Sequence, residues 1–173
     1  SLRRTGFFKD ESNWENGVLY AGKCLVSAKK DISGKYVIKY GTKSISDSAF
    51  ENCKNITEIT IPNGVEEIGA GAFSGCSSLE EIILPEGVKK LGFALFENCE
   101  NLCRVHIPSS VTEIESDIIP FHFSVSYGNP HCFMLSSPSA FICSYHWADV
   151  NDTYIANFAR ENGIKFEVCD NHN

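Results

Sequence analysis

Hydrophobic and polar positions repeat in register every 23 residues along the middle of this chain. Three stretches, 49–56, 72–79 and 95–102, place Phe, Cys and an aliphatic residue at matching positions. Each is followed by two aliphatic residues that flank one other residue, and then by Pro, at 59–62, 82–85 and 105–108. A fixed period of this length predicts a solenoid, in which each coil buries its apolar side only by stacking on its neighbours.

Stacked coils would superimpose like side chains into continuous apolar ladders. The predicted ladders are Phe50/Phe73/Phe96, Ile56/Leu79/Leu102, Ile59/Ile82/Val105, Ile61/Leu84/Ile107, Val65/Val88/Val111 and Ile68/Leu91/Ile114. Ile59 and Ile61 are two residues apart, so they share one face of a strand, which we expect to point inward. Each following Pro would end its strand, because Pro lacks the N–H donor that a sheet needs. The Ala-Phe-x-x-Cys segment predicts a short helical turn on the opposite side.

The pattern also predicts how the repeats begin and end. Residues 36–38 lie one period before 59–61, so the first coil should begin near Gly34. Two β-prone runs within 17–27 surround Ala21-Gly22 and predict a hairpin that covers the open end of the solenoid. After Asp117 the repeat fails. We expect short strands at 133–135 and 141–143, a helix with its apolar face at 154–159, and a strand at 164–168.

The combined repeat Ala-Phe-x-x-Cys-x-x-Leu-x-x-Ile-x-Ile-Pro-x-x-Val-x-x-Ile resembles the BspA-like (Treponema-type) leucine-rich repeat family over residues 36–114. Residues 12–20 resemble the inter-repeat hairpin of that family, and residues 124–173 resemble its C-terminal cap. The resemblance implies an α/β repeat solenoid, a right-handed coil with a parallel sheet of short strands. It divides a single domain, 1–173, into a hairpin cap at 1–33, repeats at 34–123 and a helix-strand cap at 124–173.

Outward positions of the predicted strands form two columns. They are Lys35/Glu58/Glu81/Arg104 and Val37/Thr60/Ile83/His106. An exposed apolar residue such as Ile83 on a sheet can mark a contact site, although a generic solvated sheet explains both columns as well. We therefore predict these eight residues as the partner-binding face. The family resemblance implies an exported or surface-displayed, bacterial protein that binds protein or glycan through a concave sheet.

The net charge and the terminal residues argue against one class of function and suggest an alternative one. A net charge of −7 with scattered basic residues argues against nucleic-acid binding. No apolar run is long enough to cross a bilayer. The chain opens with Ser1-Leu2 and without a signal peptide, which we interpret as a trimmed or processed product. Gly6-Phe7 could be the remains of a repeat start, so a structural spacer or end segment of a longer repeat protein is the alternative function.

The eight cysteines divide into two groups. Cys53, Cys76 and Cys99 occupy one repeat position, where inward packing as free thiols explains all three at once. The sequence leaves the state of the others open: Cys24, Cys103, Cys132, Cys143 and Cys169.

Two kinds of chemistry compete with the binding hypothesis. Cys143/His146 and Cys169/His172 form a paired Cys-x-x-His pattern that could hold Zn²⁺ and stabilise the C-terminal cap. A buried Cys143, an exposed His146 and a mobile tail explain the same pattern without metal. For catalysis, His131 and Cys132 supply suitable residue types, but neighbours in a strand point in opposite directions. We therefore expect no enzymatic activity and no cofactor.

Overall fold

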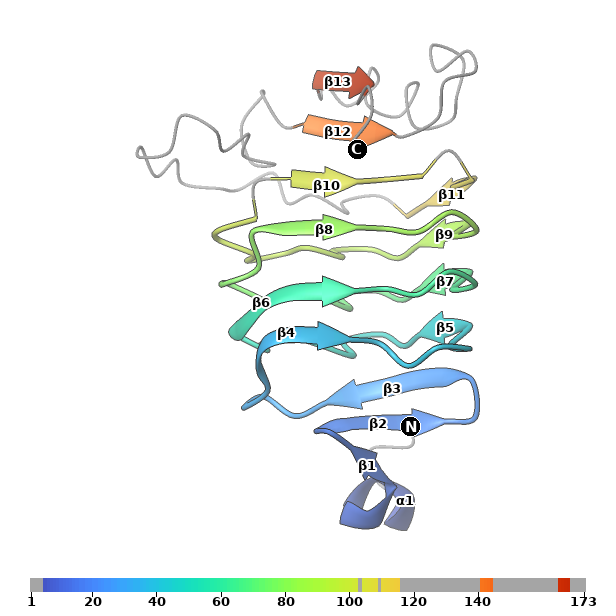
Figure 1. Ribbon diagram of the computed structural model, residues 1–173, viewed down its shortest axis with the longest axis vertical. Helices are drawn as coiled ribbons and strands as arrows, with labels where there is room; N and C mark the ends of the chain where they lie inside the picture. The colour runs from blue at the N-terminus through green and yellow to red at the C-terminus, as the bar shows by residue number, and fades with distance from the viewer. Residues whose placement is uncertain (1–4, 103, 109, 116–140, 145–164, 169–173) are drawn as a thin grey trace.

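The computed structural model is a β-solenoid whose coils stack along one axis (Figure 1). It describes residues 5–102, 104–108, 110–115, 141–144 and 165–168; of residues 104, 141–144 and 165–168 it describes the backbone. Each coil contributes one strand to each of two sheets, which confirms a solenoid of parallel short strands. The handedness of the coil stays a prediction.

The front sheet contains the strands that carry the predicted binding columns. In spatial order it consists of β4 (Ser33–Val37), β6 (Asn55–Thr60), β8 (Glu81–Ile83), β10 (Arg104–His106), β12 (Phe141–Ser144) and β13 (Lys165–Val168). All neighbouring pairs are parallel. Strands lie at the predicted positions 141–143 and 165–168, while the arrangement of the C-terminal cap stays a prediction. The predicted strand at 133–135 and the predicted helix around 154–159 lie outside the described residues.

The back sheet lies on the other side of each coil. It consists of β1 (Trp14–Glu15), β2 (Val18–Ala21), β3 (Cys24–Ala28), β5 (Ser44–Ile45), β7 (Glu67–Ile68), β9 (Lys90–Leu91) and β11 (Glu113–Ile114). Strands β2 and β3 form the predicted antiparallel hairpin, and β3 then pairs in parallel with β5. Before the hairpin come α1 (Gly6–Lys9), which contains the suggested repeat remnant, and the 3₁₀ helix η2 (Glu11–Asn13).

All six predicted ladders are buried, which confirms the register. The phenylalanine ladder shows it most directly. Ring centroids lie 5.7 Å apart between Phe50 and Phe73, and 5.9 Å apart between Phe73 and Phe96, with interplanar angles of 19° and 9°. Like side chains therefore stack above one another in one continuous core.

The Ala-Phe-x-x-Cys segments form successive turns that do not join into a regular helix. The backbone N–H groups of Phe50 and Asn52 donate to the carbonyls of Ala72 and Ser74 in the next coil, both at 2.7 Å. These N–H groups therefore do not donate to carbonyls of their own segment, as they would in a helix. Asn52 also has φ of 59°, and its repeat equivalents Gly75 and Asn98 have 72° and 56°. This left-handed conformation interrupts a helix within one turn.

The cysteine ladder is buried and free, as predicted. Its thiols donate to carbonyls of the preceding coil, for example Cys99 Sγ to Phe73 O at 3.1 Å. Burial raises the pKa of Cys53 to about 11 and that of Cys99 to about 12. Cys24 is also free and half-buried, with Sγ 3.2 Å from Ser46 Oγ. The side chains of Cys103, Cys132, Cys143 and Cys169 lie outside the described part.

Candidate functional site

The front sheet aligns the predicted columns across its strands. Lys35 lies opposite Glu58, and Val37 lies opposite Thr60. The pairing continues from Thr60 to Ile83 and from Ile83 to His106, while Glu81 lies opposite Arg104. The register follows from the sequence period, because one period advances the chain by one strand of the sheet. The side chain of Arg104 lies outside the described residues.

Three residues of the second column form an exposed strip: Val37, Thr60 and Ile83. Val37 is 68% exposed and Ile83 is 46% exposed, with the exposed Thr60 between them. Two aliphatic side chains that face water within one cross-strand row are a surface that a partner could cover with a gain in free energy.

His106 does not extend the exposed strip, which corrects the sequence prediction that it is exposed. Its side chain is 0% exposed, and Nε2 lies 2.5 Å from Glu81 Oε1. Beside it in the sheet, β12 pairs with β10 and places Cys143 opposite His106. His106 therefore lies inside the sheet, between β8 and β12, and its ring is inaccessible to a partner.

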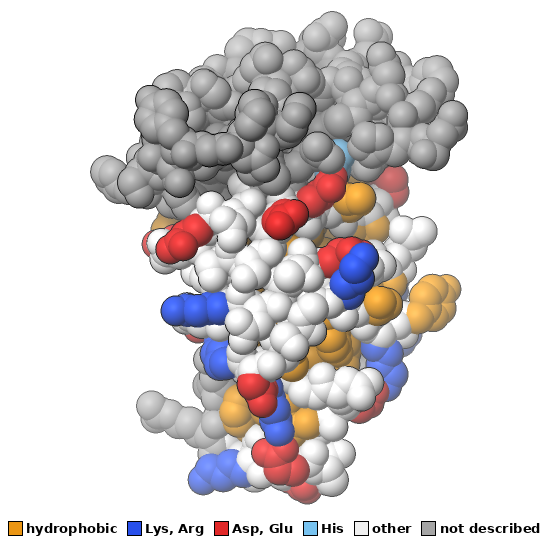
Figure 2. All heavy atoms as spheres, turned by 60° about the vertical axis from the view of Figure 1, so that its left-hand side comes forward, with side chains coloured by type: hydrophobic (Ala, Val, Ile, Leu, Met, Phe, Trp, Pro, Cys, Tyr) orange, Lys and Arg blue, Asp and Glu red, His pale blue; other side chains and the backbone are white. Residues whose placement is uncertain are grey.

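Charged side chains on this face are paired across strands. Lys35 Nζ lies 2.6 Å from Glu58 Oε2, and this hydrogen bond raises the pKa of Lys35. Because both groups are exposed, the pair contributes little to stability and can be exchanged for a partner's groups. Figure 2 shows one side of the molecule, on which acidic and basic side chains of the described residues are scattered among uncharged ones.

A hollow of about 530 Å³ lies over β6 and β8. It is lined by Thr57, Glu58, Ile59, Thr60, Ile61, Asn63, Glu80, Glu81, Ile83 and Pro85. The hollow thus brings together four of the eight predicted residues and leaves out Lys35, Val37, Arg104 and His106. Carboxylates and hydroxyls around an aliphatic side chain can accept hydrogen bonds beside an apolar contact.

Sequence reasoning missed several lining residues of this hollow. Thr57 and Glu80 precede the two outward columns, and Asn63 and Pro85 follow the strands. Glu80, Asn63 and Pro85 lie just outside a strand, whereas Thr57 lies within β6. Alternation along a strand distinguishes its two faces, but it does not identify residues that reach a hollow from beyond the outward columns.

The structure describes only part of the backbone that carries the predicted Zn²⁺ ligands. Strands β12 and β13 pair in parallel, with Ser144 opposite Val168, so the two Cys-x-x-His segments begin at neighbouring strands. His146, Cys169, His172 and the side chain of Cys143 lie outside the described residues. Within the described part, no group of three or more His, Cys, Asp or Glu residues could hold a metal. The Zn²⁺ site stays a prediction.

The repeat, the parallel strands that successive coils add to two sheets, and the stacked core define a leucine-rich repeat solenoid. The family model of the BspA type leucine rich repeat region matches residues 32–137 in 6 copies. The chain belongs to this family. Such repeat regions serve as binding or structural modules and are generally not enzymes.

Two solved structures are similar to this chain. One is a leucine rich repeat protein of T. pallidum, with 24% identity, 53% of this chain and 55% of that chain covered, and a TM-score of 0.41. The other is a leucine rich cell surface protein of Faecalibacterium prausnitzii, with 26% identity, coverages of 53% and 34%, and a TM-score of 0.40. The match thus spans about half of the first protein and a third of the second. No curated protein matches this chain.

None of the helices in the described ranges combines the length and the apolar character needed to cross a membrane.

Proposed function

We propose that this chain is a non-enzymatic binding module of an exported or surface-displayed repeat protein. Its partner is a protein or glycan that contacts the outward face of the front sheet. The exposed strip carries this proposal: Val37 and Ile83 face water in one cross-strand row, although each apolar residue in the inward ladders is buried. Extracellular or cell-surface localisation rests on the family resemblance.

The hollow beside the strip supports the same face. Its acidic rim at Glu58, Glu80 and Glu81 can accept hydrogen bonds while Ile83 provides an apolar contact. Binding would depend on shape and on contacts distributed over several coils, with no cofactor. Because His106 is buried, it is not among the proposed contact residues. Its ring instead contacts the Glu81 carboxylate and helps to position it.

The test compares two apolar positions of nearly equal exposure on different parts of the molecule. Ile83 is 46% exposed on the front sheet, and Phe93 is 47% exposed just after β9 of the back sheet. The immobilised chain captures partners from a cell-surface extract, and the recovery of each captured partner is quantified. We expect Val37→Ser with Ile83→Ser to lower recovery about tenfold, because two apolar contacts are lost.

Phe93→Ser is the matched control and should leave recovery unchanged. Circular dichroism must show that both proteins are folded. Equal recovery by the Val37/Ile83 variant and the parent would refute the front-sheet proposal and favour a structural spacer.

A further inference from the structure

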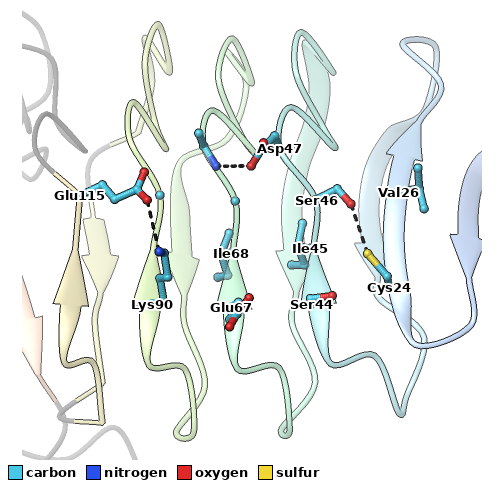
Figure 3. A pocket seen from close by; sticks show the side chains of 13 residues that line it. Cys24, Val26, Ser44, Ile45, Ser46, Asp47, Glu67, Ile68, Lys90 and Glu115 are labelled. Atoms are coloured by element: carbon cyan, nitrogen blue, oxygen red, sulfur yellow. Dashed lines mark hydrogen bonds and ion pairs between the residues drawn. The ribbon is translucent and has the colours of Figure 1, made fainter. Parts of the chain in front are cut away.

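The back sheet carries a groove of about 710 Å³, on a different sheet from the proposed binding face. In Figure 3 its labelled side chains follow one another from Cys24 and Val26 on β3 to Glu115 just beyond β11. The groove therefore crosses the strands and runs along the solenoid axis. Neighbouring strands are about 4.8 Å apart, so four steps span about 19 Å, the length of roughly six extended residues.

Close approach of successive coils keeps the floor of this groove bare. Ser46, Gly69 and Gly92 occupy one repeat position. A Cβ on Gly69 would lie 2.5 Å from the backbone nitrogen of Asp47, and a Cβ on Gly92 would lie 2.3 Å from that of Ala70. Neither position can hold a side chain without moving the adjacent backbone. The open space is thus a consequence of how the coils stack.

Charge along the groove is predominantly negative. Asp47, Glu67 and Glu115 line it together with a single cation, Lys90. Lys90 Nζ is already engaged, at 2.9 Å from Glu113 Oε1 and 3.4 Å from Glu115 Oε1.

Two carboxylates remain for an occupant. Within the described ranges no ion pair involves Asp47 or Glu67. One oxygen of Asp47 accepts the Ala70 N–H at 2.9 Å, which orients its side chain beside the groove. Both residues are exposed. Charge complementarity therefore favours a cationic occupant.

We propose that this groove binds an extended peptide segment that carries Lys or Arg side chains, independently of any partner on the front sheet. The groove is long enough for an extended peptide backbone. Lys or Arg side chains of that peptide would donate charge-assisted hydrogen bonds to Asp47 and Glu67. A sugar fits less well, because none of the residues that line the groove is aromatic and could stack on a sugar ring.

Fluorescein-labelled hexalysine tests the proposal on the whole chain by fluorescence anisotropy at low salt, with hexaglutamate as the negative probe. We expect hexalysine to bind and hexaglutamate not to bind. Asp47→Asn with Glu67→Gln should weaken hexalysine binding about fivefold, because two exposed ion pairs are lost. The matched control, Glu86→Gln with Glu97→Gln, removes two exposed carboxylates outside the groove and should change affinity less than the groove variant.

Alkylation of Cys24 locates the bound peptide. Cys24 is a half-buried free thiol at one end of the groove. Saturating hexalysine should slow its reaction with N-ethylmaleimide, measured by mass spectrometry of the peptide that contains Cys24. The proposal is overturned if hexalysine does not bind, if the control variant weakens binding as much as the groove variant, or if the alkylation rate of Cys24 is unchanged.

Discussion

Two successive cysteines of the repeat share one environment in this protein. Cys76 and Cys99 both donate to a phenylalanine carbonyl of the preceding coil, at 3.2 Å and 3.1 Å. Burial is the main cause that raises the pKa of each thiol. A thiol with so high a pKa stays protonated at neutral pH and is a poor nucleophile. The ladder therefore fills the core and does not supply chemistry.

The raised pKa makes the stability contribution of Cys99 depend on pH. The unfolded thiol ionises near its ordinary pKa of 9.0, whereas the folded thiol keeps its proton until about pH 12. Between these values the unfolded state binds fewer protons, so the contribution of Cys99 to the free energy of unfolding falls as pH rises, by up to about 1.4 kcal/mol per pH unit.

Urea unfolding of the parent and of Cys99→Ala at pH 8 and pH 10.5 checks this expectation. The parent should be the more stable at pH 8, and its advantage should shrink at pH 10.5. Comparison with the variant removes the effects of other groups that titrate in this range. An advantage that grows with pH would contradict the assigned burial of the thiol.

Each coil consists of two short strands joined by turns, and the strands depend on the coils above and below. Strands of two or three residues, such as β7 and β8, cannot bury an apolar face alone. Stacking supplies both the sheet hydrogen bonds and the aromatic contacts. Phe73 has a stacked phenylalanine on each side, so it should be among the most sensitive positions.

Phe73→Ala should lower the free energy of unfolding by about 3–5 kcal/mol, because it opens a cavity in the middle of the ladder. Urea denaturation measures the effect. Phe93→Ala, the same change at a 47% exposed side chain, should cost less than about 0.5 kcal/mol. Similar losses for the two variants would contradict the stacked core.

In the whole molecule, each coil contacts mainly its nearest neighbours. A series of backbone hydrogen bonds connects the back sheet from β3 to the residue after β9: Ser46 N–H to Leu25 O at 2.9 Å, Gly69 N–H to Ile45 O at 2.8 Å, and Gly92 N–H to Ile68 O at 2.8 Å. Leu25 in β3 is fully buried against the first coil. We propose that the hairpin acts as the N-terminal cap of the solenoid.

Leu25→Ala tests this role, since it should cost about 2–5 kcal/mol locally. Amide hydrogen exchange followed by NMR should accelerate most at Ser46, less at Gly69 and least at Gly92. Val111→Ala near the last repeat, also at a buried position, should reverse this order. Uniform acceleration at all three amides would show that the solenoid unfolds as one unit and would contradict a local capping role.

The 23-residue period was enough to predict the ladders, the register of Lys35 with Glu58 and Val37 with Thr60, and the burial of Cys53, Cys76 and Cys99. A period specifies which residues lie above one another, and inward or outward direction follows from alternation within a strand. Two other features depended on packing that the period alone does not specify. His106 is buried although Ile83, one period earlier, is 46% exposed. The groove exists because the backbone at Gly69 and Gly92 lies too close to the preceding coil for a side chain, and that separation is set by the packing of the whole stack.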